Sequence, residues 1–126
     1  MTETNLEVAR TCARAVVNER VNEAIYLTYL ITSSLNALEN SSVGRKAMAK
    51  LGFRESHEYE TSMANKLTHL LQAGDETAAD ALAPLIETLR RQLEGLMHVF
   101  AKPQFAPQII EKRVTNYKLK PYIWQY

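Results

Sequence analysis

Glycine and proline, the residues that most often interrupt helices and strands, are scarce in this chain. The 126 residues contain four of each, and three of the four prolines lie beyond position 102. The long segments between them show no sustained alternation of apolar and polar residues rich in β-branched side chains, the pattern that marks a strand. We therefore expect an all-α chain whose helices are joined by short connections.

Apolar side chains recur at the three- and four-residue spacing of a helix in three long segments. The clearest covers Glu76 to Ala101 and places these residues on one face: Leu82, Leu85, Ile86, Leu89, Leu93, Leu96, Met97 and Phe100. A segment from about Arg54 to Ala73 carries a narrower stripe: Tyr59, Met63, Leu67 and Leu70. The first segment, which reaches about Leu38, carries Val17, Val21, Ala24, Thr28, Ile31 and Leu35. The pattern predicts an antiparallel helical bundle of three long helices, with one or two short helices and an extended C-terminal tail.

Local patterns in the first half of the chain set the expected helix boundaries. Thr4-Asn5-Leu6-Glu7 has the Thr-x-x-Glu form of a capping box, so the first helix is expected to begin at Thr4. Residues 40–44 are expected to form a loop, followed by a short helix over Arg45–Leu51 that Gly52 stops.

Similar signals mark the second half. Gly74 fits the end of the third helix, and Asp75 fits the N-cap of the next one. Pro84 either kinks the last long helix or begins a new one, and both alternatives stay open. A second short helix is expected over residues 107–115.

The first long helix is apolar nearly all round over two turns. Tyr26 and Leu30 project opposite its main stripe, and Ile25 and Tyr29 fill the flank between. Such a helix is usually covered on two sides, and we expect a bundle of this size to cover only one. The second side of the helix is expected to be covered either by another copy of the chain or by the C-terminal tail folded back onto it. We predict self-association through these four residues.

The composition limits the class of protein. The length fits one domain, a helical bundle over residues 1–101 with a dependent tail over 102–126. The net charge of +1 provides no overall attraction to nucleic acid or membranes. Cys12 is the only cysteine, which excludes an internal disulfide and a cysteine-based zinc site, and we expect it to be buried. A lone thiol, with no apolar run that fits a signal peptide or membrane span, favours the cytoplasm.

The sequence contains no recognised catalytic, cofactor-binding or metal-binding pattern. It lacks a Gly-rich phosphate loop and the Glu-x-x-His pairs of di-metal bundles. His57, His69 and His98 are the only histidines, and all three are expected near the surface. Arg91 and His98 share one helix face, and this pair resembles the ribonuclease motif of HEPN domains, which are small all-α dimers. The resemblance implies proton transfer by the imidazole and phosphate binding by the guanidinium; otherwise the pair is ordinary helix surface.

Acidic residues surround His57 near the start of the third long helix. Glu55, Glu58 and Glu60 lie within three positions of it. They form either a solvated face or a surface that receives the basic tail of a neighbouring copy.

Residues 102–126 combine positive charge with aromatic rings. This segment has five basic residues and one acidic residue, whereas the preceding 101 residues have 10 basic and 13 acidic ones. The predicted partner-binding residues are Lys112, Arg113, Tyr117, Lys118, Lys120, Tyr122, Trp124 and Tyr126. This composition suits a protein groove or single-stranded nucleic acid, and it also allows the tail to pack on its own bundle.

These features together favour a non-enzymatic accessory or adaptor subunit. We expect it to self-associate and to dock a protein partner through its tail, without a cofactor, metal, membrane or small-molecule substrate. One alternative is a nucleic-acid-binding small subunit of a ribonucleoprotein complex. The other alternative is a HEPN-like ribonuclease.

Overall fold

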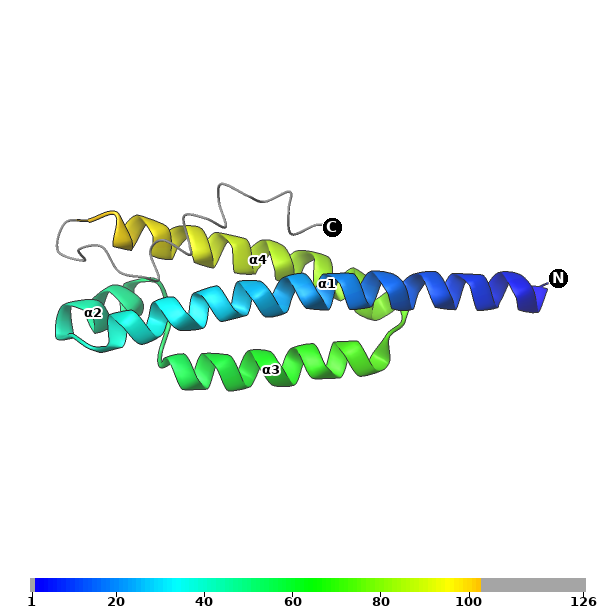
Figure 1. Cartoon of the computed structure of the whole chain (residues 1–126), viewed down its shortest axis with the longest axis horizontal. Helices are drawn as coiled ribbons and strands as arrows, with labels where there is room; N and C mark the ends of the chain where they lie inside the picture. The colour runs from blue at the N-terminus through cyan, green and yellow to red at the C-terminus, as the bar shows by residue number, and fades with distance from the viewer. Residues whose placement is uncertain (1, 103–126) are drawn as a thin grey trace.

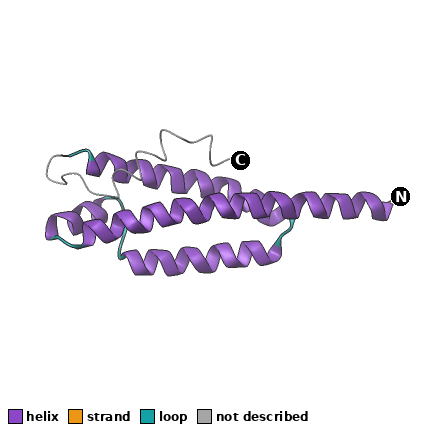
Figure 2. Ribbon diagram, in the orientation of Figure 1, coloured by secondary structure: helices purple, strands orange, loops and turns teal. Residues whose placement is uncertain are grey.

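The computed structural model describes residues 2–102, which form four helices joined by short connections (Figures 1 and 2). Helix α1 spans Thr2–Glu39, α2 Ser42–Lys50, α3 Ser56–Ala73 and α4 Glu76–Phe100. Residues 2–102 contain no strand, so the predicted all-α bundle of three long helices and a short one is confirmed. The predicted tail and the short helix expected over 107–115 lie outside the described residues.

Helix α1 is the central element of the bundle. It contacts all three other helices, whereas α3 and α4 make far fewer contacts with each other. Figure 1 shows α1 between α3 and α4, with α3 antiparallel to both and with α1 and α4 parallel. Two sides of α1 are therefore covered from within the chain, and the expectation that the bundle covers only one side is wrong.

The hydrophobic core follows the apolar stripes. All six predicted residues of α1 are buried: Val17, Val21, Ala24, Thr28, Ile31 and Leu35. In α4 the buried members of the predicted stripe are Leu82, Ile86, Leu89, Leu93, Leu96 and Phe100. In α3, Met63 and Leu67 are buried, while Tyr59 and Leu70 pack at the edge. Burial of one large apolar side chain contributes about 1.5–3 kcal/mol, so these stripes supply the main stabilisation of the fold.

The second covered side of α1 buries residues that the stripe does not include. Leu27 and Leu30 are both fully buried, and Leu38 is nearly so. Leu30 was expected on an exposed face opposite the stripe, but it belongs to the core because α1 packs between two long helices. A helix in this position needs a wider apolar surface than a helix with one neighbour.

The N-terminal part of α1 extends beyond the rest of the bundle (Figure 1). The helix begins at Thr2, so Thr4 lies inside it. The prediction that Thr4 caps the N-terminus of this helix is therefore wrong. Residues 5–12 are all exposed, because the shorter helices α3 and α4 do not cover this part. Cys12 is consequently exposed, and the expectation that it is buried is wrong.

The connection between α1 and α2 is shorter than expected. The Ser41 hydroxyl caps α2 by accepting a hydrogen bond of 2.9 Å from the Gly44 backbone N–H. Gly44 was expected in a loop, but it lies in the first turn of α2 and is buried against the backbone of Leu38. A Cβ atom at this position would lie 1.9 Å from the Leu38 carbonyl oxygen, so the packing requires glycine.

The turn between α3 and α4 follows the predicted local signals. Gly74 ends α3 with a left-handed backbone (φ 60°), and its N–H donates to the Leu70 carbonyl. The Asp75 carboxylate accepts a 2.9 Å hydrogen bond from the Ala78 N–H and caps α4. Helix α4 then continues through Pro84, so the proline does not begin a separate helix.

Polar contacts connect the long helices at several points. Arg90 of α4 pairs with Glu23 of α1, and the Tyr59 hydroxyl of α3 donates a 2.9 Å hydrogen bond to Gln92 of α4. The Arg20 guanidinium donates to the carbonyl of Ala79. Among the described residues, no helix combines the length and apolar character that a membrane crossing requires.

A candidate binding groove between α1 and α3

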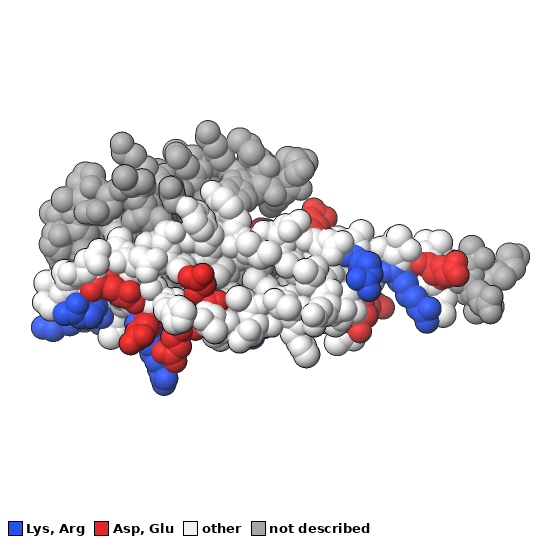
Figure 3. Space-filling view, turned by 60° about the horizontal axis from the view of Figure 1, so that its bottom comes forward, with Lys and Arg blue, Asp and Glu red and all other residues white. Residues whose placement is uncertain are grey.

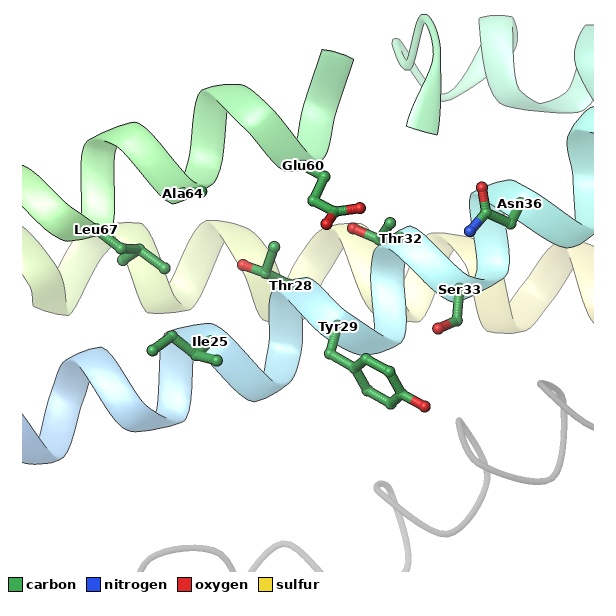
Figure 4. A pocket seen from close by; sticks show the side chains of 9 residues that line it. All are labelled: Ile25, Thr28, Tyr29, Thr32, Ser33, Asn36, Glu60, Ala64 and Leu67. Atoms are coloured by element: carbon green, nitrogen blue, oxygen red, sulfur yellow. The ribbon is translucent and has the colours of Figure 1, made fainter. Parts of the chain in front are cut away.

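A groove of about 380 Å³ lies along the contact between α1 and α3 (Figure 4). We call it the α1–α3 groove. Its lining residues are Ile25, Thr28, Tyr29, Thr32, Ser33, Asn36, Glu60, Ala64 and Leu67. The first six come from consecutive turns of α1, and the last three come from successive turns of α3. The groove therefore follows the line of contact between the two helices over several turns.

Two threonine hydroxyls beside the groove have no hydrogen-bond partner among residues 2–102. Thr28 and Thr32 are only 8% and 7% exposed, and neither Oγ1 atom makes a hydrogen bond. They lie one turn apart on α1, and Figure 4 shows both side chains directed toward α3. A buried polar group without a partner costs about 1–3 kcal/mol, so this arrangement opposes stability. Both oxygens are also closed to solvent, so a group bound in the groove could not reach them unless the helices moved.

A carboxylate lies across the groove from these hydroxyls. Glu60 of α3 extends toward Thr32 in Figure 4. Nearby on α1, the Asn36 side-chain oxygen accepts a hydrogen bond from the Ser56 hydroxyl at the start of α3. None of the lining residues is a lysine or an arginine. The groove thus offers oxygen acceptors and one negative charge, a set that suits a hydrogen-bond donor with positive charge.

The four predicted self-association residues occupy three different environments. Ile25 and Tyr29 are 50% and 47% exposed and lie along the groove. Tyr26 is partly buried against the core, with its ring centroid 6.3 Å from that of Tyr29. Leu30 is fully buried, so it belongs to the core and contributes nothing to an exposed surface. The exposed apolar surface on this side of α1 therefore consists of Ile25 and Tyr29.

The predicted acidic cluster divides between two sites. Glu60 lines the α1–α3 groove, whereas Glu55 and Glu58 line a separate hollow at the start of α3. Glu58 pairs there with Arg54 at 3.5 Å, one turn away. Figure 3 shows acidic and basic side chains close together near α2 and the start of α3, with a largely uncharged surface beyond them. Of the three acidic residues, Glu60 alone faces the unpartnered hydroxyls.

The residues considered for chemistry lie on the surface. His57, His69 and His98 are all exposed, as predicted. Arg91 is also exposed and pairs with Glu87 at 3.5 Å. Within the described part of the chain, no three His, Cys, Asp or Glu side chains are grouped as a metal site requires. The structure therefore adds no observation in favour of a ribonuclease built on Arg91 and His98.

The predicted partner-binding residues all lie outside the described part of the chain. They are Lys112, Arg113, Tyr117, Lys118, Lys120, Tyr122, Trp124 and Tyr126. Their expected role in docking stays a prediction.

Comparison with protein family models, with curated proteins and with solved structures found no match to this chain.

Sequence reasoning identified part of the groove. Ile25, Tyr29 and Glu60 were singled out for their size or charge, and Thr28 was placed on the buried stripe. Thr32 and Asn36 were missed. The spacing of Thr28 and Thr32 by four residues is the signal that places two hydroxyls on one helix face, but their lack of partners depends on where α3 lies.

Proposed function

We propose that this protein is a non-enzymatic accessory subunit that self-associates through the face of α1 that carries the α1–α3 groove. The observation behind the proposal is the pair of large apolar side chains, Ile25 and Tyr29, that stay half exposed beside the groove. Aromatic and large aliphatic residues at the edge of a groove are typical anchors of protein interfaces. A second copy is the proposed occupant because two-fold dimers are the commonest protein oligomers.

Sedimentation equilibrium of the full-length protein across a wide concentration range tests self-association. We expect a dimer, and we expect Ile25→Glu to weaken it by at least tenfold, because a charge would be buried at the centre of the interface. Val43→Glu is the matched control, since Val43 is 51% exposed but lies on α2. A wild-type protein that stays monomeric at every concentration, or equal effects of the two variants, would contradict the proposal.

In the second part of this proposal, the C-terminal tail docks a protein partner in the cytoplasm. The amino-acid composition of the tail supports this role. Tyr117, Tyr122 and Trp124 are of the residue types that most often anchor protein interfaces, and lysines lie among them. Deletion of residues 117–126 should abolish partner binding and preserve helical circular dichroism. If the shortened protein unfolds, the tail is part of the fold and the docking role fails.

Single-stranded nucleic acid is the second candidate partner of the tail. Lys112, Arg113, Lys118 and Lys120 would contact phosphates, and the nearby aromatic rings would stack on bases. Binding would then weaken steeply as salt increases. Trp124 is the only tryptophan, so its fluorescence reports directly on such binding. Unchanged fluorescence during an oligonucleotide titration at low salt would exclude this candidate.

A further inference from the structure

We propose that the N-terminal extension of α1, residues 2–14, pairs in the antiparallel direction with the same extension of a second copy. This contact is separate from the proposed one through Ile25 and Tyr29, which lie roughly three helical turns farther along α1. It goes beyond the proposed function and does not depend on it.

A hollow of about 420 Å³ lies between the extension and the turn that joins α3 to α4. We call it the extension hollow. Leu6, Ala9 and Ala13 line it from α1 and form an apolar stripe at helical spacing. Val17, four residues beyond Ala13, is fully buried, so the stripe continues the core face of α1 outward. No helix among residues 2–102 covers this continuation, because α3 ends and α4 begins at its inner end (Figure 1).

The sizes of these side chains allow two copies of the extension to fit each other. Leu6 is large and half exposed, whereas Ala9 and Ala13 are small. In an antiparallel pair centred between positions 7 and 8, Leu6 of each copy would insert between Ala9 and Ala13 of the other, as a knob enters a hole in paired helices. Two-fold symmetry makes both insertions identical, so one contact covers the apolar stripe of both copies.

The charges along the extension also favour an antiparallel pair. Its charged residues follow the order Glu3, Glu7, Arg10 and Arg14. Figure 3 shows basic side chains of the extension close to the bundle and acidic charge nearer the N-terminus. In an antiparallel pair the acidic half of each copy lies along the basic half of the other, whereas a parallel pair would place like charges together.

The inner end of the hollow is formed by the turn between α3 and α4. The Arg14 guanidinium lies against Gly74, at the C-terminal end of α3, where positive charge is favourable. Asp75 and Glu76 line the same end of the hollow. In the antiparallel pair the first turn of the other copy's α1 would reach this end, so two carboxylates would lie near the positive end of its dipole.

Two observations favour a second copy over the chain's own C-terminal segment as the occupant. Helix α4 ends at the opposite end of the bundle from the extension (Figure 1). The segment from Lys102 onward has five basic residues and one acidic residue, so it would bring positive charge to Arg10 and Arg14. A second extension carries equal numbers of acidic and basic residues and avoids this repulsion. Paired helices of this length bury less surface than a standard interface, so we expect a weak contact that forms at high concentration.

Energy transfer between copies labelled at Cys12 tests the inference. Cys12 is the only cysteine, is exposed and does not line the extension hollow, so both dyes can be attached there. All proteins are full length and carry Ile25→Glu, which weakens the other proposed contact. We expect Leu6→Glu to weaken association roughly tenfold or more, because a charge would be buried in the contact. Val8→Glu is the matched control, since Val8 is similarly exposed but lies outside the hollow, and it should change little.

A mixing experiment shows whether the two extensions contact each other directly. Glu7→Arg makes the extension more basic and Arg10→Glu makes it more acidic, so each variant alone should associate roughly tenfold more weakly than the parent. An equimolar mixture should recover the parent's association, because opposite charges then face each other. Changes within a single helix cannot produce this recovery.

Three results would overturn the inference: no energy transfer at any concentration, equal effects of Leu6→Glu and Val8→Glu, or no recovery on mixing. Association that strengthens as salt is added would show like charges side by side and would overturn the antiparallel arrangement. None of these results bears on the contact through Ile25 and Tyr29, because that contact is already weakened in every protein used. Conversely, an Ile25→Glu protein that associates as strongly as wild type would contradict the proposed function and leave this inference standing.

Discussion

The side chain of Glu39, at the last residue of α1, caps the N-terminus of α3 at Ser56. Its carboxylate accepts a hydrogen bond from the backbone N–H of Ser56, and its other oxygen lies 3.0 Å from the Ser56 hydroxyl oxygen. Glu55 is the N-cap residue of α3, but its own side chain makes no capping hydrogen bond. The start of α3 is therefore fixed by a residue of α1, and the negative charge also complements the positive end of the α3 dipole.

Replacing Glu39 should therefore destabilise the bundle. We expect Glu39→Ala to lower the free energy of unfolding by about 1–2 kcal/mol, the usual cost of losing a helix cap. Urea denaturation followed by circular dichroism measures the change. Glu55→Ala is the control and should change stability by less than about 0.5 kcal/mol, as for most surface substitutions. Equal losses in the two variants would show that Glu39 is not the cap.

Gly44 and Gly95 should respond differently to replacement by alanine. Gly44→Ala should cost about 2–3 kcal/mol or more, because the added Cβ would collide with the Leu38 carbonyl and the backbone would have to move. Gly95→Ala should be neutral or stabilising by up to about 1 kcal/mol, because the new Cβ would meet only the Leu51 side chain, which can move. Thermal unfolding of both variants provides the comparison. A well-tolerated Gly44→Ala would contradict the close packing of α2 on α1.

Tyr59 should make the free energy of unfolding decrease at alkaline pH. Burial of its side chain raises the pKa of the phenol well above its usual value. The unfolded chain releases this proton near pH 10 and the folded chain does not, so the stabilisation is complete below pH 10 and is lost as the pH rises further. We expect wild type to lose up to about 1.4 kcal/mol per pH unit more than Tyr59→Phe above pH 10. Parallel stability curves for the two proteins would contradict this account.

The N-terminal part of α1 should be the least protected part of the described helices. Residues 5–12 are all exposed, and among the described residues their neighbours are limited to the α3–α4 turn, which shares a hollow with Leu6, Ala9 and Arg10. Their amides are therefore protected mainly by their own helical hydrogen bonds. We expect these amides to exchange with deuterium orders of magnitude faster than those of residues 27–35, which include the fully buried Leu27 and Leu30. Hydrogen exchange with mass spectrometry resolves the two segments. Equal protection would show that another part of the protein covers this end.

Local sequence signals were sufficient to predict several features of the fold. Gly74 and Asp75 specify the turn between α3 and α4 through their own backbone and side chain, so their neighbours in sequence are enough to identify it. The apolar stripe of α4 likewise depends on helical spacing alone. These features could be predicted because the interactions that produce them span four residues or fewer.

Features that depend on distant residues could not be predicted. Gly44 was placed in a loop because glycine is typical of loops, whereas its contact with Leu38 requires the folded arrangement of α1 and α2. Leu30 was assigned to an exposed face because the number of helices around α1 was underestimated. In the groove, the sequence identified Glu60 as part of an acidic cluster, but only the position of α3 brings it opposite Thr28 and Thr32.

The central claim is that the protein self-associates through the face of α1 that carries the half-exposed side chains of Ile25 and Tyr29. The most direct measurement is the dimer dissociation constant of wild type, of Ile25→Glu and of Val43→Glu, each determined by sedimentation equilibrium. We expect Ile25→Glu to weaken dimerisation at least tenfold, because a charge would be buried in the interface, and Val43→Glu to leave it unchanged. A wild-type protein that stays monomeric at every concentration, or equal effects of the two variants, would contradict the claim.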